Sequence, residues 1–266
     1  GEAALHLSDA MERDKLLQEE EYRRWFRRDY DRRFGPRVWH RDFHDATIVN
    51  APDTALVGQS FGAIADTRGI HPVDAFLDLV VQYGTALRWK TLIANHRPEK
   101  LAKLLSKDAV QISFSDAGAH VRNMAFYNFP LYFLRMVRDN VAKGLPSISI
   151  EKAVHKLTGE QADWFGVDAG HLRPGARGDV VVVNPDGLDG SIDDIHEAPM
   201  ALLGGTPRMV RRNDRAVTAT FISGELVFEK GAFSPGYGTE RRTGMFLRAV
   251  ENNAPGLLPG KGGTTP

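Results

Sequence analysis

Hydrophobic residues recur along the chain with helical spacing in some segments and with the spacing of strands in others. Residues 45–50, 91–94 and 109–114 are short apolar runs with the β-branched or alternating character of strands. Pro72 and Pro98 each stand at the first position of an apolar helical pattern, where proline is well tolerated. This order of strand, helix and strand predicts a parallel α/β architecture in the first part of the chain.

Further helices are predicted from charge patterns and capping residues. Residues 8–33 are densely charged with isolated apolar positions, which predicts an amphipathic surface helix ended by a Gly-Pro pair. Acids balance bases there, so a solvated helix fits better than a nucleic-acid-binding arm. Residues 58–69 predict a helix closed by a glycine, and residues 130–143 predict a long apolar helix. Ser149 is a suitable N-cap for the helix after it.

The last third of the chain has the pattern of β-structure. Residues 179–185 contain a run of valines, which predicts a strand. Residues 217–222 and 225–228 flank the dipeptide Ser223-Gly224, and this arrangement is typical of a hairpin. A small β module is therefore predicted after the helical part.

The composition is that of a globular protein of 266 residues, 42% of them hydrophobic. The formal net charge is +0 and the pI is about 7.3, so no global field favours nucleic acid or an anionic membrane. The sequence has no cysteine, which excludes disulfides and is compatible with a reducing cytoplasm. No apolar run is long enough to span a bilayer, and the N-terminus is not a signal peptide. We expect a cytoplasmic protein without a nucleic-acid or membrane partner, and the start at Gly1 suggests processing or a missing upstream segment.

The candidate chemistry centres on Asp116. This aspartate follows the strand predicted over residues 109–114 and leads into a loop of small residues that contains His120 and Arg122. The C-terminal end of a strand is where (β/α) barrel enzymes place their catalytic groups. A carboxylate there can take the proton of a metal-activated water and return it to a leaving amine. The alternative is that Asp116 only caps the turn after it.

Four further residues are candidate substrate contacts. Arg122 has the planar guanidinium that matches a carboxylate, although a surface salt bridge would use it equally well. His120 suits a contact with metal or substrate, or an ordinary surface position. Asn95 and His96 follow the predicted strand over residues 91–94, where they either line a barrel mouth or simply start the next helix.

The usual clusters of metal ligands are absent from the sequence. There is no His-x-His, and His40 and His44, although four apart, lack the glutamate of the metalloprotease pattern. His155, on a predicted helix face, and His171, in a predicted turn, are expected to be structural. A catalytic zinc normally has three protein ligands and a water, so most ligands would have to lie outside this sequence.

Several motifs follow one another in a set order along the chain. They are Phe114-Ser115-Asp116, His120-Val121-Arg122, residues 151–158, residues 170–185 with the letters GHLRPGARGDVVVVNP, and residues 221–227. In this order and spacing they resemble the C-terminal half of an amidohydrolase-superfamily enzyme of the D-aminoacylase (N-acyl-D-amino-acid deacylase) type. The resemblance extends over most of residues 40–248.

The resemblance implies an α/β fold. The family fold is a (β/α)8, or TIM-like, barrel fused to a small β-sandwich built from both chain ends. This chain would supply the C-terminal part of the barrel, which is the catalytic part, over residues 1–165. Residues 166–250 would add a portion of the β-sandwich, and residues 251–266 would form a flexible tail.

The resemblance also implies a zinc or another divalent metal as cofactor. Asp116 matches the aspartate that faces the metal and shuttles the proton of the hydrolytic water. Arg122 matches the arginine that holds the carboxylate of the substrate. Most metal ligands of the family would lie upstream of residue 1.

The predicted function is metal-dependent hydrolysis of a non-peptide C–N amide bond, with N-acyl-D-amino acids as substrates. Two alternatives remain open. The chain is a non-catalytic half-barrel subunit that completes or regulates a partner, or it is a related hydrolase of cyclic amides of the hydantoin or dihydropyrimidine type. A partial barrel exposes an apolar face and a strand edge, so we expect association with the missing N-terminal half or with a second copy.

Overall fold

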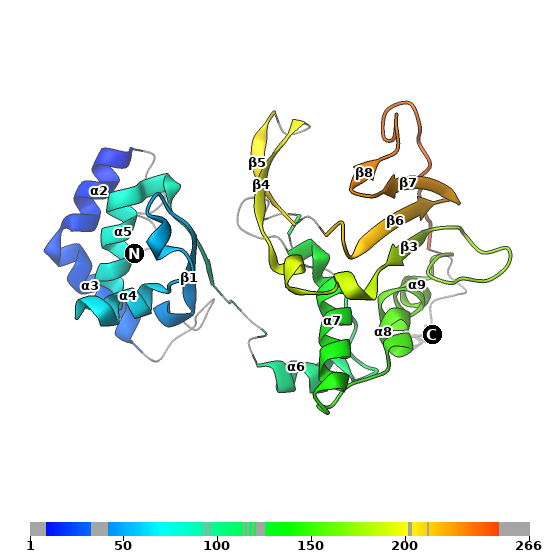
Figure 1. The fold of residues 1–266 in the computed structure, drawn as a ribbon, viewed down its shortest axis with the longest axis horizontal. Helices are drawn as coiled ribbons and strands as arrows, with labels where there is room; N and C mark the ends of the chain where they lie inside the picture. The colour runs from blue at the N-terminus through cyan, green and yellow to red at the C-terminus, as the bar shows by residue number, and fades with distance from the viewer. Residues whose placement is uncertain are drawn as a thin grey trace, which may run out of the picture. The chain divides into compact units, whose positions relative to one another are not determined.

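The computed structural model divides the chain into two compact units, Gly1–Arg97 and Pro98–Pro266 (Figure 1). The residues that it describes are 9–32, 42–91, 93, 95, 97–113, 115, 117–118, 120, 126–201, 204–211 and 213–249. Each unit has its own cluster of buried hydrophobic side chains. The expected boundary near residue 165 stays a prediction, and the expected flexible tail lies outside the described residues. In the described part of the chain, no helix is both long enough and apolar enough to cross a bilayer.

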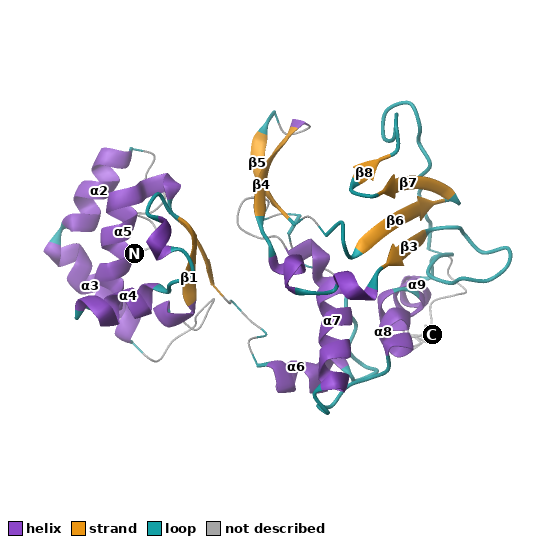
Figure 2. Cartoon of the chain, in the orientation of Figure 1, coloured by secondary structure: helices purple, strands orange, loops and turns teal. Residues whose placement is uncertain are grey.

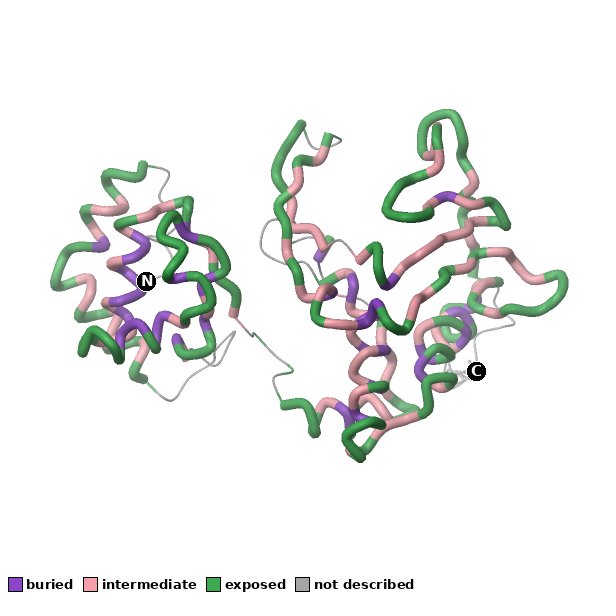
Figure 3. The backbone as a smooth tube through the Cα atoms, viewed as in Figure 1, coloured by how far each residue is buried: buried purple, intermediate pink, exposed green. Residues whose placement is uncertain are grey.

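The first unit is mostly helical. Its elements are α2 (Ala10–Gln18), α3 (Glu20–Asp31), the 3-10 helix η1 (Phe43–Asp45), β1 (Ala46–Asn50), η2 (Thr54–Leu56), α4 (Phe61–Arg68), α5 (Pro72–Tyr83), η3 (Gly84–Ala86) and β2 (Arg88–Thr91). Helix α5 is central, because α2, α3 and α4 all contact it. Buried positions gather on α4, α5 and β1 (Figure 3). At this core the Phe76 ring lies 4.9 Å from that of Phe43 and 5.1 Å from that of Phe61, between centroids.

Local capping chemistry fixes the helix ends of the first unit. The Ser60 hydroxyl accepts a hydrogen bond from the Ala63 amide at the start of α4, and Gly69 ends this helix with a left-handed φ of 64°. Pro72 opens α5, and the His71 ring accepts a hydrogen bond from the Val73 amide. The helices predicted over residues 58–69 and from Pro72 are therefore confirmed.

The single helix predicted over residues 8–33 is wrong, because α2 and α3 are separated at Glu19. The backbone of Glu19 is extended, with φ −67° and ψ 126°. The guanidinium Nε of Arg23 donates to the carbonyl of Leu17 at 2.8 Å, which satisfies a free carbonyl at the end of α2. The break allows Leu17 to be fully buried while Tyr22 and Phe26 of α3 pack on the same core.

The predicted parallel order of strands is not found among the described residues, whose named strands all pair antiparallel. The predicted strand over 91–94 is instead β2, which ends at Thr91 and pairs with β1 in the register Ile48 to Trp89. Ile48 is buried and Val49 exposed, an alternation that suits an antiparallel pair with one face on the core. The chain returns through α4 and α5, so β2 runs against β1.

The strand predicted over residues 109–114 is also wrong for its described part, 109–113, which is irregular. Ile112 packs against the core of the second unit without strand pairing. An isolated strand leaves its backbone donors and acceptors without ladder partners, and no described strand lies in register with this segment. Its apolar pattern is thus accounted for by the partly buried Ile112, which packs on the core, and not by a strand.

The second unit combines helices with antiparallel strands (Figure 2). Its elements are α6 (Pro98–Leu105), η4 (Phe126–Asn128), α7 (Phe129–Ala142), α8 (Ile150–Leu157), α9 (Gly159–Phe165), β3 (Val180–Val183), η5 (Pro185–Gly187), η6 (Gly190–Asp193), β4 (His196–Met200), β5 (Thr206–Val210), β6 (Val217–Ile222), β7 (Glu225–Glu229) and β8 (Ala232–Phe233). One sheet has the strand order β3-β6-β7-β8, and β4 and β5 form a separate hairpin. Helix α7 contacts both α6 and α8.

Several predictions for this unit are confirmed. Ser149 caps α8 through a hydrogen bond from the Lys152 amide at 3.2 Å. Ser223 and Gly224 join β6 to β7 with φ values of 54° and 82°, the positive pair that a tight hairpin turn requires. The barrel half and the complete β-sandwich of the predicted fold remain expectations.

His44 ties η1 to α4 in the first unit. Its Nδ1 lies 3.0 Å from Asp42 Oδ1, and its Nε2 lies 3.0 Å from Asp66 Oδ2. Carboxylates only accept hydrogen bonds, so both contacts are made by the protonated ring. The hydrogen bonds to Asp66 and Asp42 raise the pKa of His44. The ring occupies space above Gly62, where a Cβ would come within 2.4 Å of it.

The raised pKa of His44 predicts a pH-dependent contribution to stability. The stabilisation is complete below the unfolded pKa of about 6.5 and is lost as pH rises through the folded pKa. We expect His44→Gln to lower the free energy of unfolding at about pH 6 and to have little effect at about pH 9, measured by urea denaturation. His196→Gln, at an exposed position of β4, is the control. An equal loss at both pH values would contradict this role.

Candidate functional site

The predicted site residues are described only in part. Asp116, Arg122 and His96 lie outside the described residues. Asn95 belongs to the first unit, is exposed, and has a left-handed φ of 61°. His120 belongs to the second unit and is exposed. The structure therefore does not bring the five together as a site, and their roles stay predictions.

The chain is described on both sides of position 116. The Ala117 amide donates to the Ser115 hydroxyl at 3.4 Å, and Ala117 is only 1% exposed. Gly118 is exposed, with nothing within 4 Å of the position of a Cβ. The Ser115 side chain thus accepts a hydrogen bond from the backbone of the turn at Ala117-Gly118, as serine often does in turns.

Upstream of this turn, a buried lysine holds the chain. Lys156 of α8 is fully buried, and its ammonium donates to the carbonyl of Lys107 at 3.2 Å and to Glu160 Oε1 at 3.0 Å. Burial of an ammonium is costly unless it is paired, so these partners are needed for the position to be stable. The turn after α6, which leads toward Asp116, is therefore fixed to α8 and α9.

Downstream of the turn, η4 is fixed to the β-rich part of the unit. The buried Asn128 amide donates to the carbonyl of Ile192 at 3.0 Å and to Asn213 Oδ1 at 2.9 Å. The Arg211 amide donates to the hydroxyl of Tyr127. The segment between Lys107 and Asn128, which contains Asp116, His120 and Arg122, is therefore bounded by two stretches of chain that side-chain hydrogen bonds fix.

A network around Tyr132 completes the second anchor. The Tyr132 hydroxyl donates to Asp193 and accepts from Arg211 Nη1 at 2.7 Å. Arg135 makes a bidentate contact with Asp193: its Nη1 donates to Oδ2 at 3.0 Å and its Nη2 donates to Oδ1 at 3.1 Å. The guanidinium groups of Arg135 and Arg211 lie 4.7 and 5.3 Å from the centre of the Tyr132 ring. We call these four residues the Tyr132 network.

The surroundings of Tyr132 and Asp193 determine whether each side chain is charged at neutral pH. Burial raises the pKa of Tyr132 to about 12, and the hydrogen bond to Asp193 acts in the same direction. Burial alone would raise the pKa of Asp193, but the hydrogen bonds from Arg135 and Tyr132 leave it lowered. The tyrosine is thus neutral and the aspartate ionised at neutral pH, so the network is suited to hold structure rather than to transfer protons.

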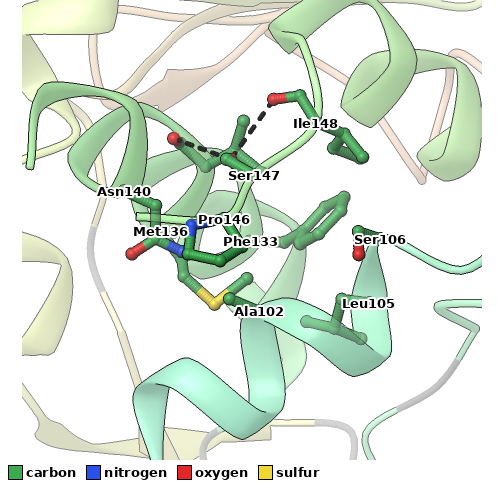
Figure 4. A pocket seen from close by; sticks show the side chains of 10 residues that line it. Ala102, Leu105, Ser106, Phe133, Met136, Asn140, Pro146, Ser147 and Ile148 are labelled. Atoms are coloured by element: carbon green, nitrogen blue, oxygen red, sulfur yellow. Dashed lines mark hydrogen bonds between the residues drawn. The ribbon is translucent and has the colours of Figure 1, made fainter. Parts of the chain in front are cut away.

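A small cavity lies between α6, α7 and residues 146–148 (Figure 4). Phe133 and Met136 line it with apolar surface. Asn140 also lines it, is 5% exposed, and its Nδ2 has no hydrogen-bond partner among the described residues. The space is about that of one water molecule, which suits hydration of this amide and excludes a substrate.

The described residues contain no group of three or more histidine, aspartate or glutamate side chains placed to hold a metal ion. Asp116 is not among them. The ligand set implied by the resemblance is thus not met within the described part of the chain.

Sequence patterns did not identify the Tyr132 network or Lys156. Arg135 is the one charged residue among positions 129–137, three residues after Tyr132, which is the one local signal of a buried polar contact. Asp193 stands 58 residues further along the chain, and nothing in its surroundings indicates its partner. Lys156 occupies a position between Ala153 and Leu157 on an amphipathic helix, where burial depends on the fold around it.

Comparison with curated proteins finds relatives of similar sequence. No family model matches the chain. Uncharacterized proteins of Mycobacterium tuberculosis and Mycobacterium bovis are 53% identical to it over 260 residues, which covers 96% of this chain and 43% of each relative. The chain thus spans less than half the length of the curated relatives that it matches.

Comparison with solved structures finds D-aminoacylases. One, described as defining a novel subset of amidohydrolases, is 21% identical, with 76% of this chain and 37% of that chain covered and a TM-score of 0.42. Another, from a study of the binuclear metal center of D-aminoacylase, is 20% identical with the same coverage and a TM-score of 0.41. The sequence motifs resemble this same family. At these TM-scores the likeness does not define the fold, and the motifs carry the functional proposal.

The Tyr132 network predicts a measurable loss of stability when one hydroxyl is removed. Tyr132→Phe deprives Asp193 of a donor and Arg211 of an acceptor, so we expect the free energy of unfolding to fall by about 1–2 kcal/mol in urea denaturation. Tyr237→Phe is the matched control, because no hydrogen bond of the Tyr237 hydroxyl is seen in the described part of the chain. Equal effects of the two substitutions would show that the network does not stabilise the unit.

Proposed function

We propose that the chain is part of a metal-dependent amidohydrolase that removes the acyl group from N-acyl-D-amino acids. The observation that carries the proposal is the ordered set of motifs from Phe114-Ser115-Asp116 to residues 221–227, which resembles the D-aminoacylase type. The hydrogen bonds that fix the described chain at Lys107 and at Asn128 support it, because a catalytic segment needs support from the elements around it.

In this proposal Asp116 holds and moves a proton. Its carboxylate takes a proton from the attacking water and returns it to the nitrogen of the departing amine. Zinc or another divalent metal supplies the activation of that water when it is bound. Arg122 binds the substrate carboxylate, and His120, Asn95 and His96 are proposed as further substrate contacts.

We also propose that this chain associates with another stretch of protein. Strand β3 lies at the edge of its sheet in the described part of the chain, with Val181 and Val182 55% and 44% exposed. An apolar strand edge of this kind favours pairing with another strand. The partner proposed is either the further length that the relatives possess or a second copy. A cytoplasmic location is proposed from the composition alone.

The activity is tested with a panel of N-acetyl-D-amino acids, their L isomers and hydantoins, each supplied with Zn2+ to a protein in which this chain is joined to the further length that its relatives possess. We expect hydrolysis of the D isomers, measured by release of the free amino acid. Asp116→Asn should lower kcat about 100- to 10,000-fold, because the amide cannot accept the proton.

The other outcomes of this assay select between the alternatives. Hydrolysis of hydantoins alone would replace the proposal with cyclic-amide hydrolysis. No hydrolysis of any compound, or equal rates for the chain and Asp116→Asn, would contradict the enzyme and favour a non-catalytic subunit.

The carboxylate clamp is tested separately. Arg122→Ala should raise KM about 10- to 100-fold for N-acetyl-D-amino acids, because a charge-assisted contact is lost. The corresponding neutral amides should keep their KM. Arg173→Ala, at an exposed turn position, is the control and should change neither. If charged and neutral substrates respond alike to Arg122→Ala, Arg122 is not the clamp.

A further inference from the structure

Two histidines of the second unit lie over one glycine. His155 is on α8, Gly159 begins α9, and Asp163 follows one turn later. His171 comes from the loop after α9. None of these residues is among the proposed catalytic or substrate-binding residues of the hydrolase.

The ring of His171 is oriented by a carboxylate. Its Nε2 lies 2.8 Å from Asp163 Oδ1, and because a carboxylate only accepts, the proton stands on Nε2. In the neutral ring Nδ1 then carries a lone pair. A Cβ at Gly159 would lie 3.1 Å from this Nδ1 and 2.7 Å from the neighbouring Cε1, so the Nδ1 edge faces the glycine.

The ring of His155 lies close to the same point above Gly159. Its Cδ2, which adjoins Nε2, would lie 3.2 Å from the same Cβ position. His155 is exposed, and the His171 side chain is 30% exposed, so solvent reaches both rings. No hydrogen bond of the His155 ring is seen within the described residues. Both imidazole rings therefore lie within contact distance of one point above Gly159, a residue that has no side chain to fill that space.

We propose that His155 and His171 bind a divalent cation of the zinc class. Imidazole nitrogen is a preferred ligand of Zn2+, Ni2+ and Cu2+. A carboxylate that holds the second ring nitrogen, as Asp163 does, is the usual support of a metal-binding histidine. The described residues offer no third protein ligand here, so water completes the coordination. The bound ion would fasten the loop at His171 to α8.

The test is a Zn2+ titration of the full chain, followed in imidazole nitrogen NMR spectra. The signals of His155 and His171 should shift together on addition of Zn2+. Either His155→Ala or His171→Ala should abolish this response, and Asp163→Asn should weaken it about 10- to 100-fold. Gly159→Ala should weaken it as well, because its Cβ displaces the His171 ring. His196→Ala is the control and should leave it unchanged.

Three outcomes would overturn the proposal: no shift of either histidine, a shift of one alone, or a response that survives His155→Ala. Because His155 is exposed, its loss should not unfold the chain, and a urea denaturation curve verifies this. The proposed hydrolase is tested independently, since Asp116→Asn should leave these shifts unchanged and His155→Ala should leave hydrolysis unchanged.

Discussion

The hydroxyl of Tyr132 joins parts of the second unit that are far apart along the chain. It connects α7 to η6 through Asp193 and to the end of β5 through Arg211. Removing Asp193 would leave the guanidinium group of Arg135 without its carboxylate in a partly buried place. The chain between the turn at Lys107 and the start of α7 contains Asp116, His120 and Arg122. One of its two fixed ends depends on this contact.

The two units are stabilised in different ways. The first relies on an aromatic cluster around Phe76, with capped helix ends and a protonated His44 at its surface. The second has a smaller apolar cluster and adds buried polar contacts, of which Lys156 with Glu160 and the Tyr132 network are the main ones. Buried polar groups of this kind fix one arrangement of the elements, because each has few alternative partners.

Local chemistry was predictable from the sequence, and long-range pairing was not. The Gly69 cap, the Pro72 helix start and the Ser223-Gly224 turn each follow from the conformational preferences of single residues. The pattern of residues 109–114 predicted a buried strand, but only Ile112 of the described part packs on the core, and whether a strand forms depends on neighbours that the pattern does not contain. Asp116 was chosen as the candidate from its motif, whereas the contacts that fix the chain around it join residues about 50 positions apart.

The most direct test of this account is hydrogen–deuterium exchange of the chain with and without the substitution Tyr132→Phe. The account predicts faster exchange at the start of α7 and in η6, with α4 and α5 of the first unit unchanged. Exchange that is equal throughout both proteins would contradict the claim that the Tyr132 network holds these elements together.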